Sequence, residues 1–428
     1  MVLFWLPLAA SWALMGAETP ILQAAIARLP DIETQLAAFG IVMSLEIAIE
    51  SPVIMLLATT TALATTRRNY LTLRRFVTCT NVIVTLAAIP MTWGPLYNLV
   101  VRELMGIPDK IAATAQPGMK IMVLWSAAIG TRRFYQGVLI RSGNTRWVGY
   151  GTAARLFSSG GSGILLAIFT RLPGVYIGSM ALMAGVCTEA IFATLAARAT
   201  VHRILSQKEA AESPDVLSFW DVARYHLPLA ATSLMTLMAQ PVIGAGLSRM
   251  PHPEENLAAW PIVWSILWIF RSPAFALPEA VIALVSARWP LDMIRRFCWA
   301  VGFYSLGALV LFLLTPMVRV YLRYIAWLPE SLSRYVVPGL LFGLLLPLIT
   351  AAHSWFRGLL MESRRTRVIY WGISLNLVLT CGVMAAGALL RAPGTILGSI
   401  ALTIAALAEV YFLKSKLSAV RSRQSATA

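Results

Sequence analysis

The strongest constraint on the fold of this chain is an internal repeat, in which one sequence pattern returns 221 positions later. The pattern keeps prolines, arginines and glycines in register as well as apolar residues. Matched positions are Pro20 with Pro241, Pro30 with Pro251, Ser51-Pro52 with Ser272-Pro273, Arg74-Arg75 with Arg295-Arg296, Pro117-Gly118 with Pro338-Gly339 and, after a one-residue deletion, Glu189 with Glu409. Chance similarity between apolar segments would not preserve these residue types together with the loop lengths. The chain therefore contains two structural repeats.

Long apolar segments make up most of each repeat. Hydrophobic residues account for 58% of the 428 residues and charged residues for 13%, and the mean hydropathy is +0.73. A soluble protein could not carry this composition on its surface without aggregating. A segment of roughly 20 apolar residues is long enough to cross a hydrocarbon core of about 30 Å. We expect such spans near 2–26, 35–65, 74–95, 118–140, 147–170, 174–198, 222–247, 257–287, 295–317, 335–361, 367–390 and 394–415.

An even number of spans in each repeat makes both repeats enter the membrane in the same direction. The expected fold is all-α, a polytopic membrane protein of about 12 transmembrane helices in two parallel six-helix repeats. We expect an N-terminal repeat at 1–205, a cytoplasmic linker at 206–221, a C-terminal repeat at 222–417 and a short cytoplasmic tail at 418–428. Lys and Arg concentrate in alternate loops, so the positive-inside rule predicts a plasma (inner) membrane protein with both termini in the cytoplasm.

The basic composition does not indicate a nucleic-acid partner. The net charge is +16, but the basic residues form short clusters between apolar segments and not one stripe. Four cysteines, Cys79, Cys187, Cys298 and Cys381, lie far apart, mostly in apolar segments, which favours neither a disulfide framework nor a metal site. We expect the lipid bilayer and a small-molecule substrate as partners, no nucleic acid, a monomer, and no cofactor apart from a coupling ion, H⁺ or Na⁺.

Two parallel repeats without a large extramembrane domain are typical of transporters whose halves rock about a site at the membrane midplane. The sequence has no His-Glu-x-x-His, Gly-x-Ser-x-Gly or nucleotide-binding loop, so we expect no enzyme, and uphill transport would draw on an ion gradient. The signature of the major facilitator type between helices 2 and 3 is also absent, since residues 65–76 read TTRRNYLTLRRF.

Three segments resemble a known family. They are LPLAASWALMGAETPILQAAIARL with the following LAAFGIVMSL, and LPLAATSLMTLMAQPVIGAGLSRM in the second repeat. These segments resemble the MatE-type exporters of the multidrug/oligosaccharidyl-lipid/polysaccharide (MOP) superfamily. They are most similar to the branch that contains the progressive ankylosis protein, with its Pro-Leu start and the Leu-Ala-small-aromatic-Gly opening of helix 2.

The resemblance implies a MATE-like fold and a secondary active transporter that exports a small solute by alternating access through a central cavity between the halves. Members of the superfamily export cationic drugs against Na⁺ or H⁺, flip lipid-linked sugars or, in the ankylosis branch, promote release of small anions. The sequence departs from the drug exporters because helix 1 has no Asp, and Glu18 is its only acid. A flippase for an amphipathic or lipid-linked substrate is the alternative.

Functional residues are expected where ionisable groups interrupt the apolar spans, because such groups are costly in the membrane unless they are paired or hydrated. Two sets of candidates follow. The candidates for substrate binding or ion coupling are Glu18, Glu46, Glu50, Arg271 and Glu279, and those for the cytoplasmic side of the cavity are Arg132, Arg133, His353 and Arg357.

Each set leaves two interpretations open. Glu46 and Glu50 are four residues apart and share a helix face, so they form either a proton- or cation-binding face or separate pairs with arginines. The arginines and the histidine of the second set either receive an anionic substrate or extend to lipid phosphates. For Glu189 and Glu409, which are equivalent in the repeats, we expect structural pairing with the basic loops.

Overall fold

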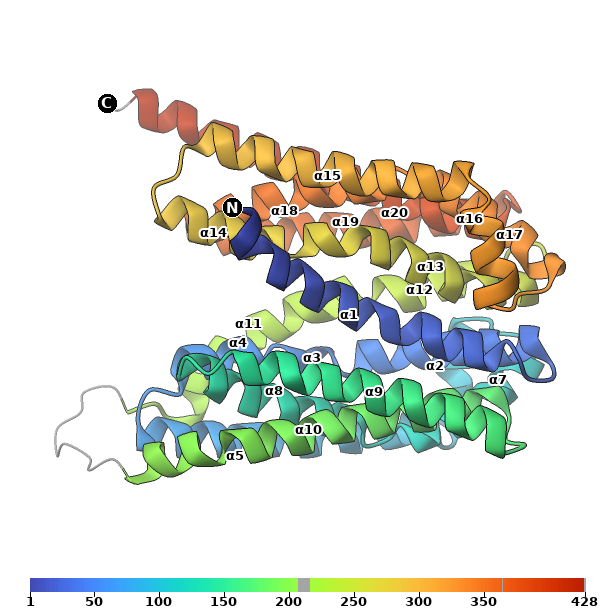
Figure 1. Cartoon of the computed structure of the whole chain (residues 1–428), viewed down its shortest axis with the longest axis horizontal. Coiled ribbons are helices and arrows are strands. Elements are labelled where there is room, and N and C mark those ends of the chain that lie inside the picture. Colours follow the sequence, from blue (N-terminus) through green and yellow to red (C-terminus); the bar gives the residue numbers. More distant parts are fainter. Residues whose placement is uncertain (207–215, 364, 427–428) are drawn as a thin grey trace. The chain divides into compact units, whose positions relative to one another are not determined.

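The computed structural model describes residues 1–206, 216–363 and 365–426, and none of them is in a β-strand (Figure 1). Most of the predicted linker at 206–221 lies outside the described residues. The helices are α1 (Val2–Ile26), α2 (Ile32–Ile49), α3 (Ser51–Ile54), α4 (Leu56–Leu63), α5 (Arg67–Thr92), α6 (Pro95–Tyr97), η1 (Asn98–Leu104), α7 (Asp109–Ile121), α8 (Trp125–Arg141), α9 (Arg146–Phe169), α10 (Gly174–Ser206), α11 (Phe219–Leu237), α12 (Ala239–Leu247), α13 (Pro253–Phe275), α14 (Leu277–Ser286), α15 (Leu291–Leu314), α16 (Met317–Val320), η2 (Tyr321–Ile325), α17 (Glu330–Phe342), α18 (Leu346–Glu362), α19 (Thr366–Leu389) and α20 (Gly394–Ala426).

The described helices confirm an all-α integral membrane protein. Ten described segments are long and apolar enough to span a membrane, when α11 with α12 and α13 with α14 are each counted as one segment. The pair of α17 and α18, which is bent by 43°, gives an eleventh if it is counted as one span. The one expected span that remains, at 118–140, falls on α7 and α8 and does not meet these criteria of length and apolarity. Arg132 and Arg133 on α8 make that segment too polar, although its equivalent in the second repeat is the bent pair.

The backbone repeats with the sequence. A π-helical turn occurs in each repeat, as η1 and as η2. Asp31 and His252, which are 221 positions apart, both have left-handed backbone angles, with φ of 58° and 57°. Gly106 and Trp327, also equivalent, have φ of 67° and 55°. A non-glycine residue with positive φ is uncommon, so its recurrence at matched positions shows that the two repeats share local geometry.

Close helix packing repeats as well. A Cβ atom on Gly137 of α8 would lie 2.7 Å from the Cβ of Thr60 on α4. A Cβ atom on Gly358 of α18 would lie 2.7 Å from the Cβ of Val281 on α14. Both residues of the second contact follow those of the first by 221 positions. Glycine allows the same close approach in both repeats because no side chain separates the helices.

Contacts divide the chain into two compact units. Unit 1 contains Met1–Gly40 and Val242–Ala428, and unit 2 contains Ile41–Pro241. The first helix of each repeat thus packs on helices of the other repeat: α1 runs along α13 in unit 1 (Figure 1), and α11 packs on α3 in unit 2. The expected boundaries at 205 and 222 concern sequence similarity and stay a prediction.

Two hydrogen bonds connect α1 and α11, which we call the exchanged helices, to the units in which they pack. In unit 1, Trp5 Nε1 of α1 donates to the carbonyl oxygen of Pro273 at 2.9 Å. In unit 2, His226 Nε2 of α11 lies 2.8 Å from the carbonyl oxygen of Pro52 and is the donor of this hydrogen bond. Each proline is three residues before a helix break, at Ala276 and at Met55. The exchanged helices therefore contact the places where the second span of each repeat is interrupted.

Candidate functional site

A buried carboxylate joins three helices of unit 2, and we call it and its partners the Glu189 cluster. Glu189 of α10 is fully buried and accepts hydrogen bonds from Arg132 Nη1 and Gln136 Nε2 of α8, the latter at 2.9 Å. From α9, Thr152 Oγ1 donates to it at 3.3 Å, and Arg155 Nη1 lies 3.7 Å from Oε2. The three helices pack together in the fold (Figure 1). Opposite charges on separate helices are thus paired inside the protein.

A matching carboxylate lies in unit 1, where it forms the Glu409 cluster. Glu409 of α20 is 2% exposed. Its Oε1 accepts from His353 Nε2 at 2.6 Å and from Arg357 Nη2 at 2.7 Å, both on α18. Asn376 Nδ2 of α19 donates to Oε2 at 3.0 Å. Each oxygen of this carboxylate therefore has at least one hydrogen-bond donor.

The two clusters use the same positions of the repeat with different side chains. By the 221-residue shift, Arg132 corresponds to His353, Gln136 to Arg357 and Arg155 to Asn376. Every one of these six side chains contacts the carboxylate of its own unit. The repeat has thus kept a central carboxylate and exchanged the donors around it. Two arginines surround Glu189, whereas one arginine and one histidine surround Glu409.

These contacts correct the expected partners of Glu189 and Glu409. The partners lie on the helices α8, α9, α18 and α19 and not in the basic loops. Of the residues expected on the cytoplasmic side of the cavity, Arg132, His353 and Arg357 are thereby paired with carboxylates inside the protein and do not extend to lipid. Gln136 and Thr152 were missed because a neutral side chain gives no charge signal in a sequence.

Glu46 and Glu50 lie in different surroundings, although they are one helical turn apart. Glu50 Oε2 accepts a hydrogen bond of 2.6 Å from Trp125 Nε1 at the start of α8. Glu46 is 1% exposed, and its Oε1 has no hydrogen-bond partner among the described residues. Neither carboxylate forms a salt bridge within the described part of the chain. Pairing of each with its own arginine, one of the two interpretations, is therefore not observed there.

Arg271 is the equivalent of Glu50 in the second repeat, and its charge has no acidic partner in the described residues. Its Nε donates to Thr350 Oγ1 of α18 at 2.8 Å. Nη1 is buried without a hydrogen-bond partner. The guanidinium carbon lies 5.6 Å from the ring centroid of Trp264 and 5.3 Å from that of Phe275. Aromatic faces, and not a carboxylate, therefore stabilise this cation.

The remaining candidates lie outside the two clusters. Arg133 on α8 has no carboxylate within salt-bridge distance among the described residues, and its Nε is buried without a partner. Glu18 is buried on α1 in unit 1. Glu279 is exposed on α14. The structure therefore brings together only part of the predicted set. These residues belong to the Glu189 and Glu409 clusters, each of which has a central carboxylate surrounded by donors.

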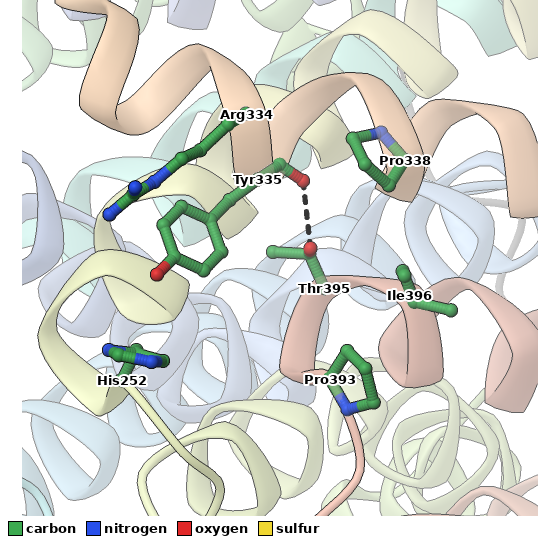
Figure 2. Close-up of a pocket in the computed structure, with 7 residues that line it drawn as sticks. All are labelled: His252, Arg334, Tyr335, Pro338, Pro393, Thr395 and Ile396. Atoms are coloured by element: carbon green, nitrogen blue, oxygen red, sulfur yellow. Dashed lines mark hydrogen bonds between the residues drawn. The ribbon is translucent and has the colours of Figure 1, made fainter.

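No metal centre or disulfide is found in the described part of the chain. No group of three or more His, Cys, Asp or Glu side chains there is placed to hold a metal ion. All four cysteines are free. A cavity of about 400 Å³ lies at the ends of α13, α17 and α20 in unit 1 (Figure 2). None of the candidate residues lines it; its walls are His252, Arg334, Tyr335, Pro338, Pro393, Thr395 and Ile396.

No protein-family model matches the sequence, and the comparison with curated proteins found no match. Solved structures do match over nearly the whole chain. An inward-facing multidrug resistance MATE family transporter of the MOP superfamily superposes with a TM-score of 0.69 at 13% identity, covering 99% of both chains. The chain has the fold of the MATE transporters.

Two further structures agree with this fold. The lipid II flippase MurJ, in an inward closed conformation, has a TM-score of 0.70 at 11% identity, over 97% of this chain and 87% of its own. A MOP superfamily transporter from Pyrococcus furiosus, described as having a binding pocket of reverse polarity, has a TM-score of 0.64 at 15% identity, over 97% and 95%. At these identities the comparisons show a shared fold.

Proposed function

We propose that the chain is a secondary active transporter that exports a small anionic solute by alternating access. The observation that carries this proposal is Arg271, a cation in a transmembrane helix that has no carboxylate partner among the described residues. The MATE fold supports the transport mechanism, because it is shared with transporters along the whole chain. The resemblance of the helix 1, 2 and 7 segments to the ankylosis branch supports an anion.

Arg271 lies near the middle of its span, far from either end, which favours a partner other than lipid phosphate. It follows Pro253 by 18 residues and precedes Ser286 by 15. At a rise of about 1.5 Å per residue, these intervals are about 27 Å and 22 Å of helix, more than an arginine side chain can extend. An arginine at this depth is expensive unless it faces a partner, a hydrated cavity or a ligand. A transported anion supplies the missing negative charge for part of each cycle.

The charge around Arg271 also favours an anion over a cation. Arg271 donates to Thr350 of α18, and His353 and Arg357 of the Glu409 cluster lie one and two helical turns further along α18. Together these groups hold two arginines and a single carboxylate. A lipophilic cation, the substrate of a multidrug exporter, would meet a positive surface there.

We propose Glu46 as the group that carries the coupling proton. It is buried, and its Oε1 has no hydrogen-bond partner among the described residues. A carboxyl group without a cation partner can take up and release a proton without breaking an ion pair. Na⁺ is the alternative coupling ion. The expected setting is the plasma (inner) membrane, with both termini cytoplasmic and the chain acting as a monomer.

The proposal is tested by thermal unfolding of the detergent-purified protein with citrate, pyrophosphate or tetraphenylphosphonium, at several pH values and Na⁺ concentrations. A ligand that binds only the folded state stabilises it by RT ln(1 + [L]/Kd), so the unfolding temperature rises with the free ligand concentration and with the affinity. We expect stabilisation by an anion and none by the cation, and loss of the effect in Arg271→Gln. Arg334→Gln is the matched control, because Arg334 is exposed and lines the separate cavity of Figure 2. Stabilisation by the cation alone would refute the proposal.

A flippase for an amphipathic, lipid-linked substrate is the second candidate, and the similarity to the lipid II flippase supports it. Its headgroup would also be anionic, so binding alone does not distinguish the two functions. Transport assays in proteoliposomes distinguish the two functions. Accessibility of a lipid-linked substrate to an external enzyme would rise only with a flippase, whereas release of a trapped water-soluble anion would rise only with a solute exporter.

A further inference from the structure

Arg271 lies within a row of aromatic side chains on one face of α13. The row consists of Trp264, Trp268, Arg271 and Phe275, at successive intervals of four, three and four residues. Such intervals place side chains above one another along a helix. We call these four residues the α13 row. All of them are half-buried, so the row is neither part of the fully buried core nor a fully exposed surface.

The rings of the row contact one another and a further ring from α1. Ring centroids of Trp264 and Trp268 are 5.8 Å apart, and those of Trp268 and Phe275 are 4.8 Å apart. Trp12 of α1 lies 5.6 Å from Phe275 and 6.3 Å from Trp268. These separations are typical of interacting aromatic pairs, which hold each other in fixed orientations. The rings therefore form a preformed surface and not a set of independent side chains.

A glycine on α1 makes this arrangement possible. A Cβ atom on Gly16 would lie 2.7 Å from Trp268 Cδ1. No larger residue fits at this position unless the indole moves. Trp268 is thus held between α1 and the neighbouring rings of α13. The position of its ring is set by the backbone of another helix.

The guanidinium group is fixed by the same surroundings. Thr350 accepts from Nε, and the rings of Trp264 and Phe275 lie within 5.6 Å and 5.3 Å of the guanidinium carbon. Neither terminal nitrogen donates a hydrogen bond to a described residue, and Nη1 is buried. The arginines Arg132 and Arg357 of the two clusters are paired with carboxylates. Arg271 is oriented but unpaired, which is the arrangement expected of a ligand-binding residue.

We infer that the α13 row, with Trp12, binds an anion that carries a planar ring, of the aryl carboxylate class. The inference rests on the proposed transport of an anion and adds the substrate class. The carboxylate accepts hydrogen bonds from the terminal nitrogens of Arg271, whose planar fork matches two carboxylate oxygens. The attached ring packs against the indoles of Trp264 and Trp268. An anion without a ring would bind the guanidinium group of Arg271 but would not contact the aromatic side chains of the row.

Three probes separate the charge from the aromatic ring: benzoate has both, cyclohexanecarboxylate has the charge on a saturated, non-planar ring, and benzamide has the aromatic ring without the charge. Binding to the purified full-length protein is measured by thermal unfolding and by quenching of tryptophan fluorescence. We expect benzoate to bind at least tenfold more tightly than either of the other probes. Arg271→Gln should abolish the binding of both carboxylates, and Arg271→Lys should retain it in part.

Substitution of one ring tests the aromatic contribution by itself. Trp268→Leu should reduce benzoate binding to the level of cyclohexanecarboxylate, whose own binding should not change. Trp299→Leu is the matched control, since Trp299 is an exposed residue of α15 outside the row. If Trp268→Leu does not fold, Trp268→Phe keeps a ring and should keep the preference for benzoate.

The outcomes distinguish the two proposals. Equal binding of benzoate and cyclohexanecarboxylate, both dependent on Arg271, would refute the aromatic substrate class and leave anion transport in place. Binding of carboxylates that does not change in Arg271→Gln would refute both. Binding of benzamide as tight as that of benzoate would show that the row recognises rings and not anions, and would also refute the inference.

Discussion

Trp5 and His226 occupy equivalent positions in the two repeats, and the ring nitrogen of each donates to the carbonyl of an equivalent proline. The distances are 2.9 Å to Pro273 and 2.8 Å to Pro52. Each proline lies three residues before a helix break, where backbone carbonyls lose donors from the following turn. The first helix of each repeat supplies a replacement donor. Two different side chains thus make the same contact.

This contact predicts a loss of stability on removal of the donor. Trp5→Phe keeps an aromatic ring but cannot donate, so we expect a loss of about 1 kcal/mol, the usual net value of one hydrogen bond. Trp5→His should retain more stability, because histidine makes the contact at the equivalent position. Thermal unfolding in detergent measures both variants. Equal unfolding temperatures for Trp5→Phe and the unmodified protein would contradict the prediction.

The buried clusters predict unequal effects of two matched substitutions. Glu189→Gln leaves Arg132 and Arg155 without their carboxylate, whereas Glu409→Gln leaves only one arginine, Arg357. Removal of one partner of a buried ion pair costs about 3–5 kcal/mol. We therefore expect both variants to unfold at lower temperature and Glu189→Gln to be the more damaging. Glu279→Gln, at an exposed position, serves as the control and should unfold as the unmodified protein does.

Substitution of Glu46 is expected to change transport without changing the fold. Glu46→Gln replaces a carboxyl whose Oε1 has no partner in the described structure, so folding and expression should stay close to normal. Transport in vesicles should lose its dependence on pH, since the proposed proton carrier is gone. The measurement is the transport rate at a series of pH values on both sides of the membrane. An unchanged pH profile would remove Glu46 from the coupling mechanism.

The glycine contacts predict that one substitution has opposite effects at different positions. Gly137→Ala and Gly358→Ala place a Cβ atom 2.7 Å from Thr60 or Val281, and overpacking of this kind costs about 1–3 kcal/mol. Gly149→Ala, on α9, meets nothing within 4 Å and should be neutral or stabilising, by up to about 1 kcal/mol. Thermal unfolding of the three variants tests the pattern. A destabilised Gly149→Ala would show that helix packing is not the cause.

The parallel repeats predict the sidedness of two loops. Single cysteines at Ser142 and Ser363, introduced into a protein without native cysteines, should react with a membrane-impermeant reagent only from the cytoplasm. The two positions are equivalent, so they should behave alike. Labelling of either one in intact cells would overturn the parallel arrangement and the cytoplasmic location of both termini.

The sequence was sufficient to predict the helical class, the repeat and most of the spans. Prolines and arginines at fixed intervals report on the chain order of helices, but not on which helices pack together. The exchange of α1 and α11 between the units was therefore missed. The span at 118–140 was counted with the others because its apolar residues surround Arg132 and Arg133. In the structure these arginines lie in α8, and the segment formed by α7 and α8 is not among those long and apolar enough to span a membrane.

The sequence identified the two carboxylates and the candidates Arg132, His353 and Arg357, but not the pairing between them. Glu189 and Glu409 are recognisable from sequence as equivalent acids in apolar helices. Gln136 and Asn376 become donors only through the rotation of α8 and α19 about their axes, which depends on packing across the whole unit. Arg271 was identified as an intramembrane charge. Its aromatic neighbours follow helical spacing and could have been found from that spacing.

The exchange of first helices imposes an order on the synthesis of the protein. Trp5 and Pro273 are 268 residues apart, so α1 leaves the ribosome long before its partner α13 exists. At about 5–20 residues per second, α1 waits roughly 13–54 s for that partner. The N-terminal repeat meanwhile lacks α11, which completes unit 2 only after the start of the second repeat. Neither half of this duplicated chain can then finish folding by itself, and two separately expressed halves should become stable only when each is present to receive the other's first helix.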